Sequence, residues 1–92
     1  MQITIEVPSG LRQYCNGARE IRVSDSTNFP TMIMQLSAHY PGLTRRIVAP
    51  GGGFYDFVGV FLNQKSLAGT ASDEIKLQDG DVVSLIPAMA GG

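Results

Sequence analysis

Few side chains in this sequence have the types and spacing that chemistry requires. Its one cysteine, Cys15, and its one histidine, His39, are the candidates for a nucleophile and a base. A catalytic cysteine needs a nearby base or positive charge, and nothing in the sequence brings these two residues together. We therefore interpret Cys15 as an incidental thiol in a loop and His39 as a solvated residue near a helix end. One cysteine and one histidine also argue against a zinc site.

The glycine run at 51–53 is a second candidate, because glycine-rich loops can bind phosphate. The run lacks the Lys-Ser/Thr ending of the P-loop and does not lead into a helix. We interpret it as a flexible loop. The aromatic residues beside it, Phe54, Tyr55 and Phe57, are expected to cap the core rather than to form an exposed patch for a partner.

The strongest chemical feature is Gly91-Gly92, at the end of the sequence. Glycine makes up about 7% of residues on average, so chance places two glycines at the end of roughly 0.5% of chains. A frayed terminus is the alternative interpretation. Glycine has no Cβ and can enter a narrow channel, and a terminal glycine offers an unhindered carboxylate. The pair therefore favours a tail that enters another enzyme's active site and reacts through its carboxylate.

Composition excludes several classes of protein. The 92 residues suit one domain, and with 43% hydrophobic and 16% charged residues the chain is typical of a globular protein. A net charge of −1 argues against nucleic-acid binding. The first ten residues alternate in polarity, unlike a signal peptide, and no segment approaches the roughly 20 apolar residues that span a bilayer. We expect a cytoplasmic protein that binds no membrane and is a monomer when free.

Alternation of apolar and polar residues predicts a strand over residues 2–7 and a second over 18–23, with the odd-numbered apolar residues of both facing inward. A loop or wide turn is expected between them. Polar capping residues precede Pro30, which fits the first turn of a helix. That helix is predicted to end near His39, before Pro41-Gly42. Its buried face is predicted to hold Phe29, Ile33, Leu36 and Tyr40.

The second half of the chain contains two further strands. Residues 41–56 are expected to be mostly connection, with Ile47 and Val48 against the core. The remaining expected elements are a central strand at 57–63, a turn at 63–66, a short edge segment from Leu67, a tight turn at Asp79-Gly80-Asp81 and a last strand at 82–86. In that last strand Val83 and Leu85 should point inward and Ile86 outward. The alternative that Ile86 is an ordinary core residue is given equal weight.

This element order predicts an α+β architecture, the β-grasp, in which a mixed sheet of four to five strands packs on one helix. The first and last strands are expected to lie side by side and parallel at the sheet centre. Residues 1–87 would form the domain, and 88–92 a flexible tail.

The last fourteen residues, DGDVVSLIPAMAGG, resemble the C-terminal signature of the MoaD/ThiS family of ubiquitin-like sulfur carriers. The run VPSGLRQYCNG at residues 7–17 also resembles the family's first strand and loop. Together with the expected order of strands and helix, the likeness covers nearly the whole chain, and its specific part is the last fourteen residues. It implies that a ubiquitin-activating-type adenylyltransferase, using ATP and Mg²⁺, adenylates the terminal carboxylate. A sulfur donor then makes a thiocarboxylate, and a second biosynthetic enzyme accepts the sulfur. The chain itself would bind no cofactor and would not be an enzyme.

The resemblance also assigns roles to individual residues. Gly92 would carry the adenylate and then the sulfur, and Gly91 would give steric clearance. The tail residues Ala88, Met89 and Ala90 would line the entry channel, Pro87 would set the tail's direction, and Ile86 would be the candidate for partner docking. Asp79, Gly80 and Asp81 are interpreted as a structural turn rather than a site.

Two other functions remain open. The same activated Gly92 would serve a ubiquitin-like modifier joined to lysines of target proteins. A plain β-grasp binding module with a frayed terminus is the third hypothesis. The sulfur acceptor is also open: molybdopterin, thiamine, cysteine, methionine or a specialised metabolite could be the product, and the VPSGLRQYCNG start and the long 41–56 section favour amino-acid or secondary-metabolite sulfur. Whether Gly92 is the native terminus or the product of processing is left open too.

Overall fold

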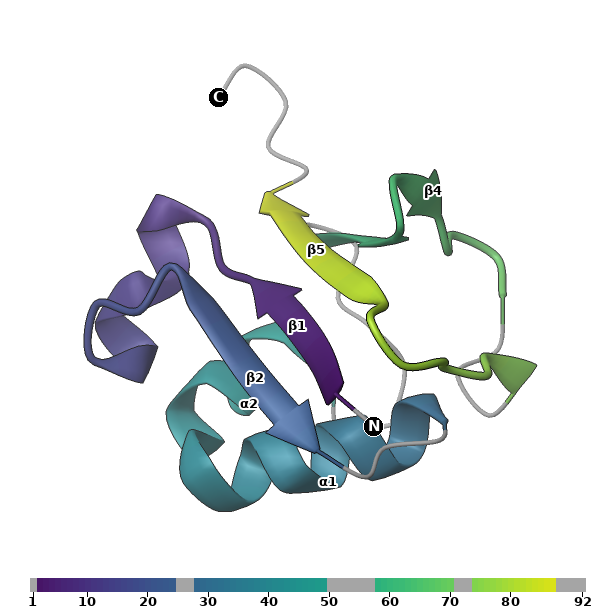
Figure 1. The fold of residues 1–92 in the computed structure, drawn as a ribbon. Helices are drawn as coiled ribbons and strands as arrows, with labels where there is room; N and C mark the ends of the chain where they lie inside the picture. Colours follow the sequence, from purple (N-terminus) through teal and green to yellow (C-terminus); the bar gives the residue numbers. More distant parts are fainter. Residues whose placement is uncertain (1, 25–27, 50–57, 71–73, 88–92) are drawn as a thin grey trace.

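The protein folds around a five-stranded sheet, as described by a computed structural model for residues 2–24, 28–49, 58–70 and 74–87. In chain order the elements are β1 (Gln2–Glu6), a 3-10 helix η1 (Ser9–Cys15), β2 (Glu20–Ser24), α1 (Phe29–His39), α2 (Pro41–Ile47), β3 (Val58–Leu62), β4 (Lys65–Ser66) and β5 (Val82–Pro87). The strand order is β2-β1-β5-β3-β4. Figure 1 shows both α-helices on one side of the sheet. No helix of the described residues covers the opposite side, which we call the open face.

The central pair of strands is β1 and β5, which run parallel with Ile5 opposite Val83. This confirms the predicted neighbours at the sheet centre. A parallel pair requires a crossover, and here the two helices and β3 and β4 supply it. Alternation holds in both strands: Ile3, Ile5, Val83 and Leu85 are all buried against the helices. The sheet therefore separates an apolar face from an open, mostly polar one.

The first hairpin differs from its prediction in two respects. β2 spans Glu20–Ser24, two residues later at its start than expected, although Ile21 and Val23 do point inward. The expected loop before it is mostly η1, the 3-10 helix at Ser9–Cys15. Asn16 ends this helix with a left-handed φ of 57°, a conformation that asparagine tolerates better than most residues.

Helix α1 begins where the capping residues indicated. The side chain of Asn28 accepts a 2.9 Å hydrogen bond from the backbone N–H of Thr31, which satisfies one of the free donors at a helix start. The buried face differs from the prediction, since it consists of Phe29, Met32 and Leu36, whereas Ile33 and Tyr40 are only partly buried. Spacings of three and four fit either choice, and packing against the sheet selects Met32.

The prediction that residues 41–56 are mostly connection is wrong for its first part, because α2 spans Pro41–Ile47. Pro41 lies in the first turn of this helix, where its missing N–H costs nothing. Leu43 and Ile47, one helical turn apart, are buried, and this confirms that Ile47 packs against the core. The sheet therefore packs on two α-helices rather than one. The predictions for residues 50–57 lie outside the described residues.

β3 pairs with β5 on the side away from β1, which places it inside the sheet as predicted. Asn63 and Gln64 form the turn after it, with positive φ angles of 50° and 74°. The edge strand β4 follows at Lys65–Ser66, so the predicted edge segment starts two residues earlier than Leu67. Positive φ at both central residues is the geometry of a tight two-residue hairpin, which ends the turn sooner than expected.

Candidate functional site

The end of β5 is the part of the described structure nearest to the candidate reactive residues. Pro87 is the last residue of the strand and pairs with Val58 of β3. The predictions for Ala88, Met89, Ala90, Gly91 and Gly92 lie outside the described residues, so they remain predictions. In the sequence these residues follow directly after Pro87, the end of the central strand β5.

Ile86 is an exposed apolar residue on that open face. Its side chain is 47% exposed, while its neighbour Leu85 is buried. The core interpretation of Ile86 is therefore wrong, and the outward orientation is confirmed. An exposed aliphatic side chain next to the tail in the sequence is consistent with the predicted docking role. Covering apolar surface with a partner removes it from water, which lowers the free energy of the complex.

Phe61 is a second apolar residue of this face, and the sequence did not single it out. It is half-buried on β3, and its ring lies against Gly59, whose hypothetical Cβ would be 3.2 Å from Cε1 of Phe61. Gly59 in turn lies directly opposite Ile86 in the sheet. The alternation along β3 already indicates that residues 59 and 61 share one face of the strand. Only the register of β3 and β5 places them beside Ile86.

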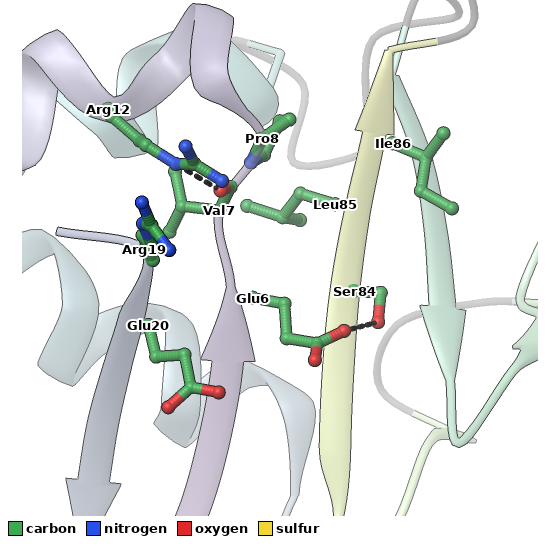
Figure 2. Close-up of a pocket in the computed structure, with 9 residues that line it drawn as sticks. All are labelled: Glu6, Val7, Pro8, Arg12, Arg19, Glu20, Ser84, Leu85 and Ile86. Carbon is green, nitrogen blue, oxygen red and sulfur yellow. Dashed lines mark hydrogen bonds between the residues drawn. The ribbon is translucent and has the colours of Figure 1, made fainter. Parts of the chain in front are cut away.

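A cavity of about 350 Å³ lies next to the end of β5. Figure 2 shows its residues: the apolar ones are Val7, Pro8, Leu85 and Ile86, and the polar or charged ones are Glu6, Arg12, Arg19, Glu20 and Ser84. Two hydrogen bonds hold its walls. The Ser84 hydroxyl donates to Oε1 of Glu6 at 2.6 Å, and Nε of Arg12 donates to the Val7 carbonyl oxygen at 2.9 Å. No side chain in this cavity was predicted as a site except Ile86.

The positions of Cys15 and His39 in the structure agree with the expectation that neither side chain is catalytic. Cys15 is buried, and its Sγ donates to the Ala18 carbonyl oxygen at 3.5 Å. Burial is the main cause that raises the pKa of the Cys15 thiol above its ordinary value, which disfavours the reactive thiolate. The expectation of an incidental thiol holds, although the residue ends η1 rather than lying in a loop. His39 is exposed at the end of α1, as expected, with its ring 6.4 Å from that of Tyr40.

The Asp79-Gly80-Asp81 segment is a structural turn, as predicted. Gly80 has a φ of 87°, which favours glycine. Oδ1 of Asp79 accepts a 2.7 Å hydrogen bond from the backbone N–H of Gln2, and the Asp81 carboxylate accepts bonds from Asn63 and Gln78. These bonds tie the turn to the neighbouring strands and occupy its carboxylates.

The described part of the chain holds no cluster suited to a metal. Within residues 2–24, 28–49, 58–70 and 74–87, no group of three His, Cys, Asp or Glu side chains is placed to hold a metal ion. None of the helices in the described ranges is long and apolar enough to cross a lipid bilayer.

Comparison with known proteins identifies a family and two similar sulfur carriers. Residues 5–92 match the model of the ThiS family. The sulfur carrier protein CysO of Mycobacterium tuberculosis (strain H37Rv) and that of Mycobacterium bovis are each 30% identical to this chain over 94 residues, and each comparison covers 100% of both chains.

Solved structures agree with the predicted β-grasp fold. The crystal structure of Mycobacterium tuberculosis CysO superposes with a TM-score of 0.82 at 25% identity, covering 95% of this chain and 99% of that one. A chain of the Amycolatopsis orientalis BexX/CysO complex gives 0.84 at 23% identity, covering 98% and 99%. SAMP1 from Haloferax volcanii gives 0.77 at 22% identity and covers both chains completely. At these last two identities the likeness concerns the fold.

Proposed function

This chain belongs to the ThiS family, and on that premise we propose that it is a sulfur carrier that holds sulfur as a thiocarboxylate at Gly92. The observation that carries the proposal is the extent of the match. The family model extends to residue 92, and the 30% identity to CysO covers the whole chain. Both therefore include the Gly91-Gly92 pair at which the chemistry would occur.

The proposed cycle requires activation, because a free carboxylate is a poor acyl donor. A carboxylate oxygen of Gly92 attacks the α-phosphate of ATP on a partner adenylyltransferase, which forms the acyl-adenylate and releases pyrophosphate. A sulfur nucleophile then displaces AMP, and the carbonyl carbon keeps the sulfur. An acceptor enzyme takes that sulfur for biosynthesis. This protein supplies the reactive group and the docking surface, and the partners supply the catalysis.

The arrangement of β5 supports this division of roles. The strand is held on both sides, by β1 and β3, as far as Ser84, so the segment after Pro87 starts from a fixed point. Ile86 offers apolar contact one residue before that point. A chain of the same fold was solved in the BexX/CysO complex, which illustrates that such a chain can form a complex with another protein. We propose an adenylyltransferase and an acceptor enzyme as the partners here.

Protein modification is the alternative that relatives in fold keep open. SAMP1, a small archaeal modifier protein, shares the fold at 21% identity in a second structure from Haloferax volcanii. That identity supports the fold alone, so sulfur transfer is the better supported function. Covalent adducts between this protein and target lysines, recovered from cells, would favour modification instead.

The test is intact-mass spectrometry of the protein after incubation with its adenylyltransferase, ATP, Mg²⁺ and a sulfide source. We expect the mass to rise by the difference between sulfur and oxygen, and the added mass to map to Gly92. The matched control lacks Gly92 and should stay unmodified. An unchanged mass for the intact protein, with an enzyme that is active on other carriers, would contradict the proposal.

A further inference from the structure

Two prolines end the pairing between β1 and β5. The parallel ladder runs through Thr4 opposite Val82 and Glu6 opposite Ser84, and the Thr4 N–H donates to the Asp81 carbonyl oxygen at 3.0 Å. Donors in such a ladder recur at every second residue. The next rung would need the N–H of residue 8 from β1 and of residue 87 from β5. Both are proline, which has no N–H.

The missing rung leaves β5 with an open edge at its end. Beyond Ser84 the strand continues to Pro87, and within the described residues its pairing there is with β3, where Leu85 lies opposite Val60. The Leu85 carbonyl oxygen is the acceptor that residue 8 would have paired with, and Pro8 supplies no donor to it. An unpaired strand edge is a template for an added strand.

The cavity lies along this open edge. Leu85 and Ile86 line it from β5, and Val7 and Pro8 line it from the departing β1 segment. Figure 2 shows how its charged side chains lie: the Glu6 carboxylate turns to Ser84, Arg12 and Arg19 lie together on the other side, and the Glu20 carboxylate is directed away from both arginines.

The two arginines have spare hydrogen-bonding capacity. Arg12 uses its Nε to hold the Val7 carbonyl oxygen, and its terminal N–H groups have no partner among the described residues. Arg19 makes no ion pair or side-chain hydrogen bond within those residues. Glu20 also lines the cavity, but Figure 2 shows its carboxylate directed away from the two arginines. Two adjacent guanidinium groups in this arrangement match the forked geometry by which arginine binds a carboxylate.

We propose that this edge and cavity bind an extended, acidic segment of the adenylyltransferase that receives the tail. A backbone N–H of that segment donates to the Leu85 carbonyl oxygen, and a carboxylate of the segment binds Arg19 and the terminal N–H groups of Arg12. The inference rests on the proposed function, because the cavity adjoins the start of the tail and the enzyme that takes the tail must come close to it.

The first test restores the missing donor. Pro8→Ala supplies an N–H that can pair with the Leu85 carbonyl oxygen and so close the edge. We expect the new amide at position 8 to be protected from hydrogen exchange, and calorimetry to give an affinity for the adenylyltransferase, without ATP, that is about tenfold weaker. Pro30→Ala, in the exposed first turn of α1, is the matched control and should bind like wild type.

The second test removes the charge match and does not depend on the backbone edge. Arg19→Glu should weaken binding to the same enzyme about tenfold or more, because a charge-assisted bond becomes a repulsion. Arg22→Glu makes the same change in net charge on β2, outside the cavity, and should have a much smaller effect. Thermal unfolding of both variants checks that the fold persists.

The outcomes separate this inference from the proposed function. If Arg19→Glu and Arg22→Glu bind alike, or if Pro8→Ala protects its new amide and still binds like wild type, the segment does not use this edge. The proposed function would still be supported if the mass measurement showed the gain of sulfur at Gly92. If a second copy of this chain occupied the edge, Arg19→Glu would change the oligomeric state by light scattering and leave enzyme binding unchanged, which also overturns the inference. Absence of any complex between the wild-type chain and the enzyme overturns it as well.

Discussion

The side-chain amide of Asn63 donates a 2.9 Å hydrogen bond to Oδ1 of Asp81, although 18 positions separate them in the sequence. The same asparagine accepts a 2.9 Å bond from the backbone N–H of Val82 through Oδ1. These bonds join the turn after β3 to the turn that starts β5. Since β5 delivers the tail, the pair helps to fix the strand on which the proposed function depends.

Asp81→Ala is expected to destabilise the protein by about 2 kcal/mol, because two hydrogen bonds of roughly 1 kcal/mol each lose their acceptor. Chemical denaturation measures the change in the free energy of unfolding. Glu74→Ala removes the same charge at an exposed position and should change stability by less than about 0.5 kcal/mol. Equal effects of the two substitutions would show that net charge, rather than the bonds to Asn63 and Gln78, stabilises this turn.

Cys15 gives the fold a dependence on alkaline pH. Burial raises its pKa in the folded protein, so as pH rises the unfolded chain loses the thiol proton first. The free energy of unfolding should therefore be independent of this group below its ordinary pKa of about 8.5 and should fall as pH rises above it. Cys15→Ala should lack this part of the decline. Urea denaturation between about pH 7 and pH 10 compares the two, and parallel curves would contradict the prediction.

The same burial predicts that Cys15 is not part of sulfur transfer. Alkylation by iodoacetamide at neutral pH should be slow in the folded protein and fast in denaturant. Cys15→Ala should gain the same mass at Gly92 as wild type in the sulfur-loading reaction. Loss of loading in a variant that remains folded would give the thiol a role that its burial argues against.

Ile86 and Met34 form a matched pair for testing the docking face. Both are exposed apolar residues, 47% and 73% respectively, but Ile86 lies on the open face beside the tail and Met34 on helix α1. Ile86→Ala should raise the Kd for the adenylyltransferase about five- to tenfold, as expected for losing part of an aliphatic contact. Met34→Ala should leave it unchanged. A similar loss in both variants would place the enzyme elsewhere.

The length of the tail should decide reactivity without affecting the fold. Adding one residue after Gly92, or deleting Gly92, should abolish sulfur loading because either change moves the reacting carboxylate by one residue from its position in the partner's active site. The thermal unfolding midpoint should not change, since Leu85 is the last buried core residue of the described chain. Loading of the extended protein at wild-type rate would rule out the Gly92 carboxylate as the required acceptor of AMP, because Gly92 has no free carboxylate in that variant.

The sequence by itself determined the strands and their faces. A period of two allows only one assignment of Ile3, Ile5, Ile21 and Val23 to the core, because shifting it by one residue would bury the charged side chains. It also located the first helix through Asn28 and Pro30, and the tight turn at 79–81. These features depend on local backbone chemistry, which the chain carries in every context.

The second helix shows where local signals fail. Pro41-Gly42 was interpreted as an end, yet proline is equally suited to the first turn of a new helix. A helix of this length is marginal alone, and burial of Leu43 and Ile47 stabilises it. The choice of Met32 over Ile33 on α1 has the same origin, since both fit the helical period and only the opposing sheet distinguishes them.

The candidate site divides in the same way. The sequence alone indicated Gly92 as the reactive end and Ile86 as an outward contact, because composition and alternation are properties of the chain. Pro8 and Pro87 lie near opposite ends of the sequence, and nothing local connects them. Only the register of β1 and β5 places both at one rung of the ladder, where two missing N–H groups open an edge beside Arg12 and Arg19. Hydrogen bonding between distant strands decided that, and it exists only in the folded protein.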